Sequence, residues 1–101
     1  MILILTTTDK KTIAVKIGKA LLTKKLIACC SILPMDSSYW WKGKIANEKE
    51  FQLILKTKAG NFAKIEKIIK QLHTYELPEV ISIKIDKAGK DYLKWMNGAI
   101  R

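Results

Sequence analysis

The chain has 101 residues, 49% of them hydrophobic and 28% charged, a composition typical of one folded domain over residues 1–101 rather than of a disordered segment. Its two cysteines are adjacent, which excludes a disulfide-stapled scaffold and a zinc finger. No apolar run reaches the ~20 residues of a membrane-spanning helix, and the first residues lack the pattern of a secretory signal peptide. We therefore expect a cytoplasmic protein with no membrane partner.

The charge is strongly basic, with 19 Lys+Arg against 9 Asp+Glu and a formal net charge of +10. Such a charge favours a nucleic-acid partner, whose affinity would fall steeply with added salt. All but one of the basic residues are lysines, however, and the exception is Arg101. Arginine supplies the planar, two-pronged donor that reads guanine and grips phosphate. We therefore interpret the lysines as solvated surface and do not expect nucleic-acid binding.

The first third of the chain predicts a strand, a helix and a second strand. Residues 1–7 are apolar and then rich in threonine, which favours a buried strand. Asp9 or Thr8 can cap the helix that follows. The apolar residues of this helix recur at helical spacing, and they are Ile13, Ile17, Ala20 and Leu21. Residues 26–33 form a nearly continuous apolar run, which predicts a second strand ended by Pro34.

The middle of the chain predicts a hairpin. Residues 37–41 are aromatic and β-prone, and they lead into a turn with Gly43 as its pivot. We expect the third strand over residues 51–57, and a start as early as Ile45 stays open. The chain therefore returns on itself between the second and third strands.

The last part of the chain predicts a helix, a strand and a short closing helix. The first of these follows Asn61 or Gly60 and has an isoleucine-rich face. Residues 80–85 alternate between polar and apolar side chains, which indicates a half-buried strand. The closing helix carries its larger apolar residues on one side, and they are Tyr92, Leu93, Trp95 and Met96.

This order, β-α-β-β-α-β with an extra C-terminal helix, predicts an α+β fold of the ferredoxin-like kind, an antiparallel sheet with both main helices on one face. The other face is left bare. Residues 26–33 are apolar on both of their sides, and the neighbours Trp40 and Trp41 point to opposite sides of a strand. Because no remaining element is large enough to cover so much apolar surface, we expect a second copy of the chain to cover it.

Residues 73–79 are the densest functional candidate, since they hold the only histidine, a tyrosine and two glutamates. A neutral imidazole beside carboxylates such as Glu76 can bind a transition metal or act as a general base. The alternative is structural, because a histidine in the last turn of a helix also complements the helix dipole. His73 is therefore a candidate metal ligand and equally a candidate structural residue.

The cysteines offer soft ligands. Cys29 together with His73 can bind copper if the fold brings them together. Buried free cysteines are common in protein cores and most are inert, so a purely structural role for Cys29 and Cys30 stays open. Nucleotide-binding loops and the serine-hydrolase motif are absent, and the predicted third strand lacks the aromatic pattern of an RNA-recognition domain.

Several segments together resemble the CutA family, the divalent-cation tolerance proteins. The match covers essentially the whole chain and keeps the order and spacing of the family's motifs. The segments are LIACCSILP at residues 26–34, SSYWWKGKI at 37–45, LKT at 55–57, HTYELPE at 73–79 and YLKW at 92–95.

The resemblance implies a ferredoxin-like subunit in a tight homotrimer, with sheets packed edge to edge around a threefold axis. It also implies a cytoplasmic, non-enzymatic protein linked to tolerance of divalent metals and reported to bind copper. Cys29 stands at the cysteine of the family's second strand, and His73, Glu76 and Glu79 stand in its HPYExPE segment. These residues give a metal site of His73, Cys29 and Glu76, with Glu76 or Glu79 supplied by a neighbouring subunit.

This chain departs from the family pattern at several places. Thr74 replaces a proline, Lys42 a glutamate and Ser31 an asparagine. In some bacterial members a copper site is assigned to a first-strand cysteine and two consecutive histidines, and the matching positions here are Leu5, Leu72 and His73. Leucine cannot bind a metal, so His73 is the only one of these three residues that can act as a ligand.

The sequence thus predicts a CutA-type homotrimer that binds copper or another divalent cation. The alternative is a trimeric signalling module that binds a small anionic ligand in a lysine-rich cleft between subunits. A ligand of that kind would raise the thermal stability without any metal.

Overall fold

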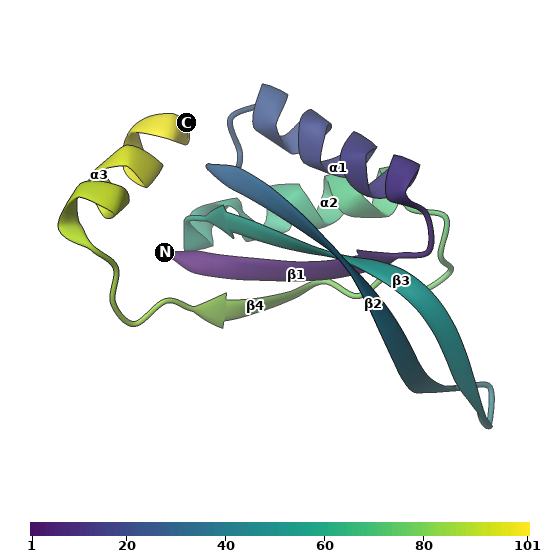
Figure 1. The fold of residues 1–101 in the computed structure, drawn as a ribbon. Coiled ribbons are helices and arrows are strands. Elements are labelled where there is room, and N and C mark those ends of the chain that lie inside the picture. The colour runs from purple at the N-terminus through teal and green to yellow at the C-terminus, as the bar shows by residue number, and fades with distance from the viewer.

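The computed structural model describes all 101 residues and has the predicted ferredoxin-like α+β fold (Figure 1). No helix in it is both long and apolar enough to cross a membrane. A 3-10 turn, η1 (Ala59–Asn61), leads into the second helix. The main elements, in chain order, are β1 (Ile2–Thr8), α1 (Lys11–Thr23), β2 (Cys29–Trp41), β3 (Lys44–Thr57), α2 (Phe62–Leu72), β4 (Ile81–Lys84) and α3 (Lys90–Ala99).

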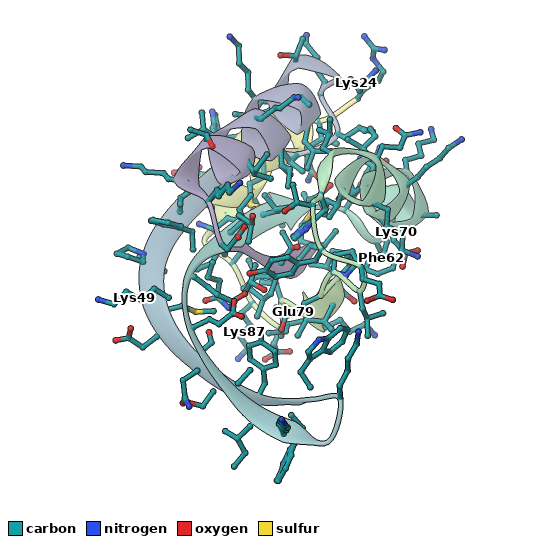
Figure 2. All side chains as sticks on the ribbon, turned by 90° about the vertical axis from the view of Figure 1, so that its right-hand side faces the viewer. Lys24, Lys49, Phe62, Lys70, Glu79 and Lys87 are labelled. Carbon is teal, nitrogen blue, oxygen red and sulfur yellow. The ribbon has the colours of Figure 1, made fainter.

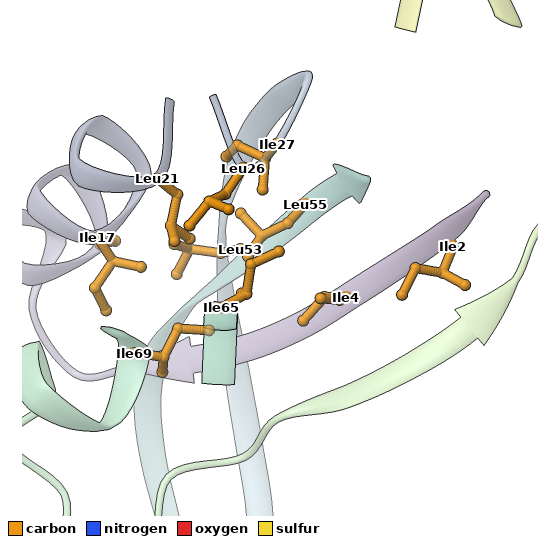
Figure 3. Close-up of a cluster of buried hydrophobic side chains, with 11 residues drawn as sticks. Ile2, Ile4, Ile17, Leu21, Leu26, Ile27, Leu53, Leu55, Ile65 and Ile69 are labelled. Atoms are coloured by element: carbon orange, nitrogen blue, oxygen red, sulfur yellow. The ribbon is translucent and has the colours of Figure 1, made fainter. Parts of the chain in front are cut away.

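The four strands form one antiparallel sheet in the order β2-β3-β1-β4, and α1 and α2 cover one of its faces (Figure 1). Ile4 and Leu55 are partners in neighbouring strands and are fully buried beneath the helices. Figure 3 shows Ile17 and Leu21 of α1 and Ile69 of α2 approaching this face of the sheet. This layer is the hydrophobic core, and it forms because period-2 strands and period-3.6 helices each present one apolar side.

The second strand is longer than predicted, and Pro34 does not end it. β2 runs through Pro34, which is paired opposite Phe51, and continues to Trp41. A proline is tolerated here because β2 is an edge strand, where a missing backbone donor need not break the ladder. Residues 26–28, predicted to open the strand, are buried loop instead.

The β2–β3 hairpin closes at the predicted turn. Lys42 and Gly43 both have positive φ, 51° and 77°, as a two-residue turn with the twist of a hairpin requires. β3 begins at Lys44, in agreement with the early start that the sequence left open. Since β1 pairs with β3 only as far as Phe51, the outer part of the hairpin projects beyond the sheet (Figure 1).

The predicted helix cap is wrong for α1. Its N-cap residue is Lys10, and no side chain caps the helix; the Thr8 hydroxyl only accepts a long, 3.5 Å bond from the Lys10 amide. Asn61 precedes α2 as predicted, but its side chain donates to the carbonyl of Leu26 at 3.0 Å. Thr57 donates to the same carbonyl at 2.5 Å. These two polar groups are buried because they satisfy the backbone of the loop before β2.

α1 and α2 leave the opposite face of the sheet largely uncovered, and α3 contacts it at Lys56, through Tyr92. Leu33, Ile81 and Ile83 have the opposite parity to the core residues, and each is 47% exposed. The predicted bare apolar face is therefore present. β4 is not the half-buried strand predicted, since all four of its residues are exposed. It lies at the edge of the sheet, and its apolar side faces away from the helices.

Candidate functional site

A cleft of ≈ 640 Å³ lies between the outer part of the β2–β3 hairpin and the segment that links α2 to β4. Its walls combine aromatic, small polar and acidic side chains. The lining residues are Thr7, Met35, Ser37, Ser38, Tyr39, Trp40, Trp41, Glu48, Glu50, Thr74, Tyr75, Glu76, Leu77 and Glu79. No lysine or arginine is among them.

His73 holds the linking segment against the sheet. It is the C-cap residue of α2, and its Nδ1 accepts a hydrogen bond from the backbone N–H of Tyr75 at 3.0 Å. Because Nδ1 carries no proton in this arrangement, Nε2 is the protonated nitrogen, and it donates to the carbonyl of Thr7 at 2.5 Å. The two ring nitrogens are therefore both engaged, and neither offers a free lone pair.

Tyr75 and Glu50 join the two walls of the cleft. The Tyr75 hydroxyl donates to Glu50 Oε2 at 2.7 Å. Burial, followed by the hydrogen bond to Glu50 and the charge of that carboxylate, raises the pKa of Tyr75 far above its ordinary value. The hydroxyl therefore stays protonated and can keep its donor bond to Glu50. Loss of water in the cleft, and then the Glu50 carboxylate, also raises the pKa of Glu79.

The chain as a whole matches a known family. Residues 2–99 match the CutA1 divalent ion tolerance protein family. The chain belongs to the CutA1 family. It is 41% identical to the divalent-cation tolerance protein CutA of Pyrococcus horikoshii over 96 residues, which cover 95% of this chain and 94% of that protein. It is 34% identical to the Thermotoga maritima protein of the same description, with 99% of each chain covered. The predicted family is thus confirmed.

Solved structures agree with this assignment. The crystal structure of CutA1 from Pyrococcus horikoshii matches with a TM-score of 0.94 and 38% identity, covering 100% of this chain and 99% of that one. The periplasmic divalent cation tolerance protein CutA from Archaeoglobus fulgidus matches with a TM-score of 0.96 and 36% identity over 100% of both chains. The ferredoxin-like fold is therefore shared with these CutA1 structures along the full length of the chain.

Within this one CutA1-family chain the three predicted metal ligands do not come together. Cys29 pairs with Lys56, which pairs with Leu3, whereas His73 contacts Thr7, four residues further along β1. At about 3.3 Å per residue this is about 13 Å along the strand alone. Indeed, no group of three or more histidine, cysteine, aspartate or glutamate residues in the chain is placed to hold a metal.

The two cysteines of this CutA1-type chain have different surroundings. The sulfur of Cys30 packs against α1, where a Cβ on Gly18 would lie 2.9 Å from it. Burial, and then the neighbouring Cys29, raises the pKa of Cys30 to about 11. Cys29 points to the face without helices, because its parity is opposite to that of Cys30. Cys30 therefore packs as a core residue, and Cys29 is half-buried on the other side of β2.

Glu50 is the central residue of the cleft that the sequence analysis missed. It is 5% exposed, yet it precedes the predicted third strand and carries no recognisable motif. The alternation of side chains along a strand could have indicated it, because Glu48, Glu50 and Gln52 lie on the same side of β3. Its burial depends on Tyr75, 25 residues further along the chain, and that contact is visible only in three dimensions.

Proposed function

We propose that this CutA1-family chain acts as a cytoplasmic, non-enzymatic homotrimer whose subunits together bind a divalent cation, with copper as the first candidate. The observation that carries the proposal is the apolar face without helices. Soluble monomers rarely expose a contiguous apolar patch of this kind. The curated relatives are named divalent-cation tolerance proteins, which supports the link to divalent metals.

The exposed face supports assembly because its apolar residues come from both edges of the sheet. Leu33 lies on β2, at one edge, and Ile81 and Ile83 lie on β4, at the other. A neighbouring subunit that covers this face would bury all three at once, each contributing roughly 1–2 kcal/mol of transfer free energy. Edge strands also carry unpaired backbone groups that a second chain can use.

The metal site in this proposal is completed between subunits. One chain holds no group of three ligands, so a cation needs residues of at least two copies. Cys29 or His73 of one subunit with Glu76 or Glu79 of its neighbour would give the mixed sulfur, nitrogen and oxygen donors that suit copper or zinc. His73 would first release either the Thr7 carbonyl or the Tyr75 amide.

The experiment is a Cu(II) titration by calorimetry, with the molar mass followed by light scattering. We expect the wild type to have three times the 11.5 kDa of one chain and to bind Cu(II). His73→Ala, Cys29→Ser and Glu76→Gln should weaken binding, and Glu66→Gln, on the outer side of α2, should not. Ile83→Glu should abolish both assembly and binding. Binding that persists in a monomeric Ile83→Glu variant would contradict the shared site, and a monomeric wild type would contradict the homotrimer.

The alternative of a small anionic ligand has less support from the cleft that the structure contains. Four glutamates line it and no lysine does, so its field repels an anion. The lysine-rich cleft expected for a signalling module lies between subunits and stays a prediction.

A further inference from the structure

The positive charge of this chain is concentrated on its helices. Residues 10–25 are α1 with its flanking residues, and residues 58–72 are α2 with the turn before it. Together they hold ten of the 19 lysines and arginines but only one of the 9 aspartates and glutamates, so they carry nine of the ten net positive charges. The interpretation of the lysines as merely solvated surface does not explain such an uneven division.

The exposed lysines of residues 10–25 and 58–72 form one surface, which we call the basic layer. α1 and α2 lie side by side on one face of the sheet, so lysines from both helices extend into the same solvent region (Figure 1). Figure 2 shows Lys24, at the end of α1, and Lys70, on α2, at the outside of the molecule.

The basic layer has almost no counter-charge of its own. Its single acidic residue, Glu66, is paired with Lys70 at 3.5 Å, and this is the one ion pair in the chain. α1 contains no acidic residue, and Lys10 and Lys11 stand at its N-terminus, where the helix dipole disfavours a cation. The layer therefore holds uncompensated positive charge, which an external anionic surface would relieve.

The basic layer stays exposed in the homotrimer proposed above. That assembly covers the face of the sheet without helices, whereas α1 and α2 lie on the opposite face (Figure 1). Binding at the basic layer therefore needs neither the subunit contacts nor the shared metal site, and it can fail independently of both.

The composition of the basic layer indicates which kind of anion fits it. The two segments contain no arginine, the residue that grips phosphates and reads bases, and their only aromatic residue, Phe62, packs against the core. Val15 is 49% exposed and stands one helical turn from both Lys11 and Lys19. An exposed aliphatic side chain between lysines gains little from a nucleic acid, but it can be buried at the headgroup boundary of a bilayer.

We propose that the basic layer binds the surface of a membrane rich in anionic lipids. Lysine ammonium groups need no fixed geometry for this contact, because the negative potential of such a surface attracts each of them. Their long stems let the charges reach the lipid phosphates while Val15 lies against the bilayer. The contact is peripheral and needs no spanning segment, so the expectation of no membrane partner, which rested on the lack of a long apolar run, does not bear on it.

The test is co-sedimentation of the full chain with vesicles in the presence of a metal chelator. One set of vesicles contains equal parts of phosphatidylglycerol and phosphatidylcholine, and the other contains phosphatidylcholine alone. We expect the chain to sediment with the anionic vesicles only, and to be released as NaCl is raised from about 50 mM to about 500 mM. Equal sedimentation with both sets, or none with the anionic set at about 50 mM NaCl, would overturn the proposal.

Two double variants of equal net charge separate the basic layer from the charge of the whole chain. Lys16→Glu with Lys67→Glu reverses two charges of the layer, one on each helix, and we expect it to weaken binding to the anionic vesicles about tenfold or more. Lys87→Glu with Lys94→Glu is the matched control, since both lysines are exposed and lie outside the layer. It should weaken binding at most about twofold. Equal losses in the two variants would refute the assignment to the basic layer.

Nucleic acid is the competing polyanion, and a DNA duplex of random sequence serves as the comparison. We expect Val15→Ser to weaken binding to the anionic vesicles several-fold and to leave DNA binding unchanged, whereas Val15→Leu keeps both. If the chain binds DNA more tightly than vesicles at equal phosphate concentration, and the Lys16 and Lys67 variant loses that binding, nucleic acid is the partner and the membrane assignment is wrong.

Discussion

At the scale of single residues, Gly18 shows how closely α1 approaches the sheet. A Cβ there would meet the sulfur of Cys30 at 2.9 Å. We expect Gly18→Ala to destabilise the protein by roughly 1 kcal/mol, because overpacking of ~1–3 kcal/mol exceeds the ~1 kcal/mol gained in helix propensity. In a Cys30→Ala background the same change should stabilise it. Urea unfolding at matched chain concentration measures both, and an equal effect in the two backgrounds would contradict the contact.

The thiol of Cys30 is the second residue-scale case, since its pKa is raised to about 11. At about pH 8 only about 0.1% of such a thiol is thiolate, the reactive form. We expect Cys30 in a Cys29→Ser variant to react slowly with iodoacetamide at that pH. The rate should rise about tenfold per pH unit until the pKa is reached, and unfolding in urea should remove the protection. Rapid labelling of the folded variant at about pH 8 would contradict the raised pKa.

At the scale of elements, the bond from Tyr75 to Glu50 ties the α2–β4 segment to the hairpin. Tyr75→Phe removes the only hydrogen bond of a buried carboxylate, so we expect a loss of about 1–3 kcal/mol in the free energy of unfolding. Tyr92→Phe is the matched control, because the Tyr92 hydroxyl accepts a bond from Lys56 at an exposed site. Hydrogen exchange should also show faster opening of the α2–β4 segment in Tyr75→Phe alone. Equal effects of the two substitutions would remove the special role of Tyr75.

The elements themselves were largely predictable, and the errors have physical causes. Hydrophobic periodicity places every helix and strand, because local pattern and tertiary structure agree in this chain. The prediction that the second strand ends at Pro34 was wrong, because the local sequence does not show that β2 is an edge strand, where a proline is tolerated. The segment 73–79 was visible as a cluster of functional groups. The cleft was not, because it forms only when Tyr75 meets Glu50 across 25 residues.

At the scale of the whole molecule, net charge dominates the electrostatics. A chain of +10 has a single ion pair, an exposed one between Lys70 and Glu66, so repulsion among lysines is largely uncompensated. We expect the melting temperature to rise between about 20 mM and about 300 mM NaCl, as screening shortens the Debye length. Lys64→Glu, on the exposed side of α2, should reduce that salt dependence. A melting temperature that falls with NaCl would show that attraction outweighs repulsion.

The inner position of β1 also governs how a ribosome can deliver this chain. Of the four strands of this sheet, β1 is made first, and it lies between β3 and β4, both made later. One edge of β1 can pair as soon as β3 has been made. Its other edge pairs with β4, which is complete only after ~27 further residues. At ~5–20 residues per second that interval is about 1–5 s. During this interval the unpaired edge of the apolar strand β1 is exposed to other nascent chains on the same messenger RNA.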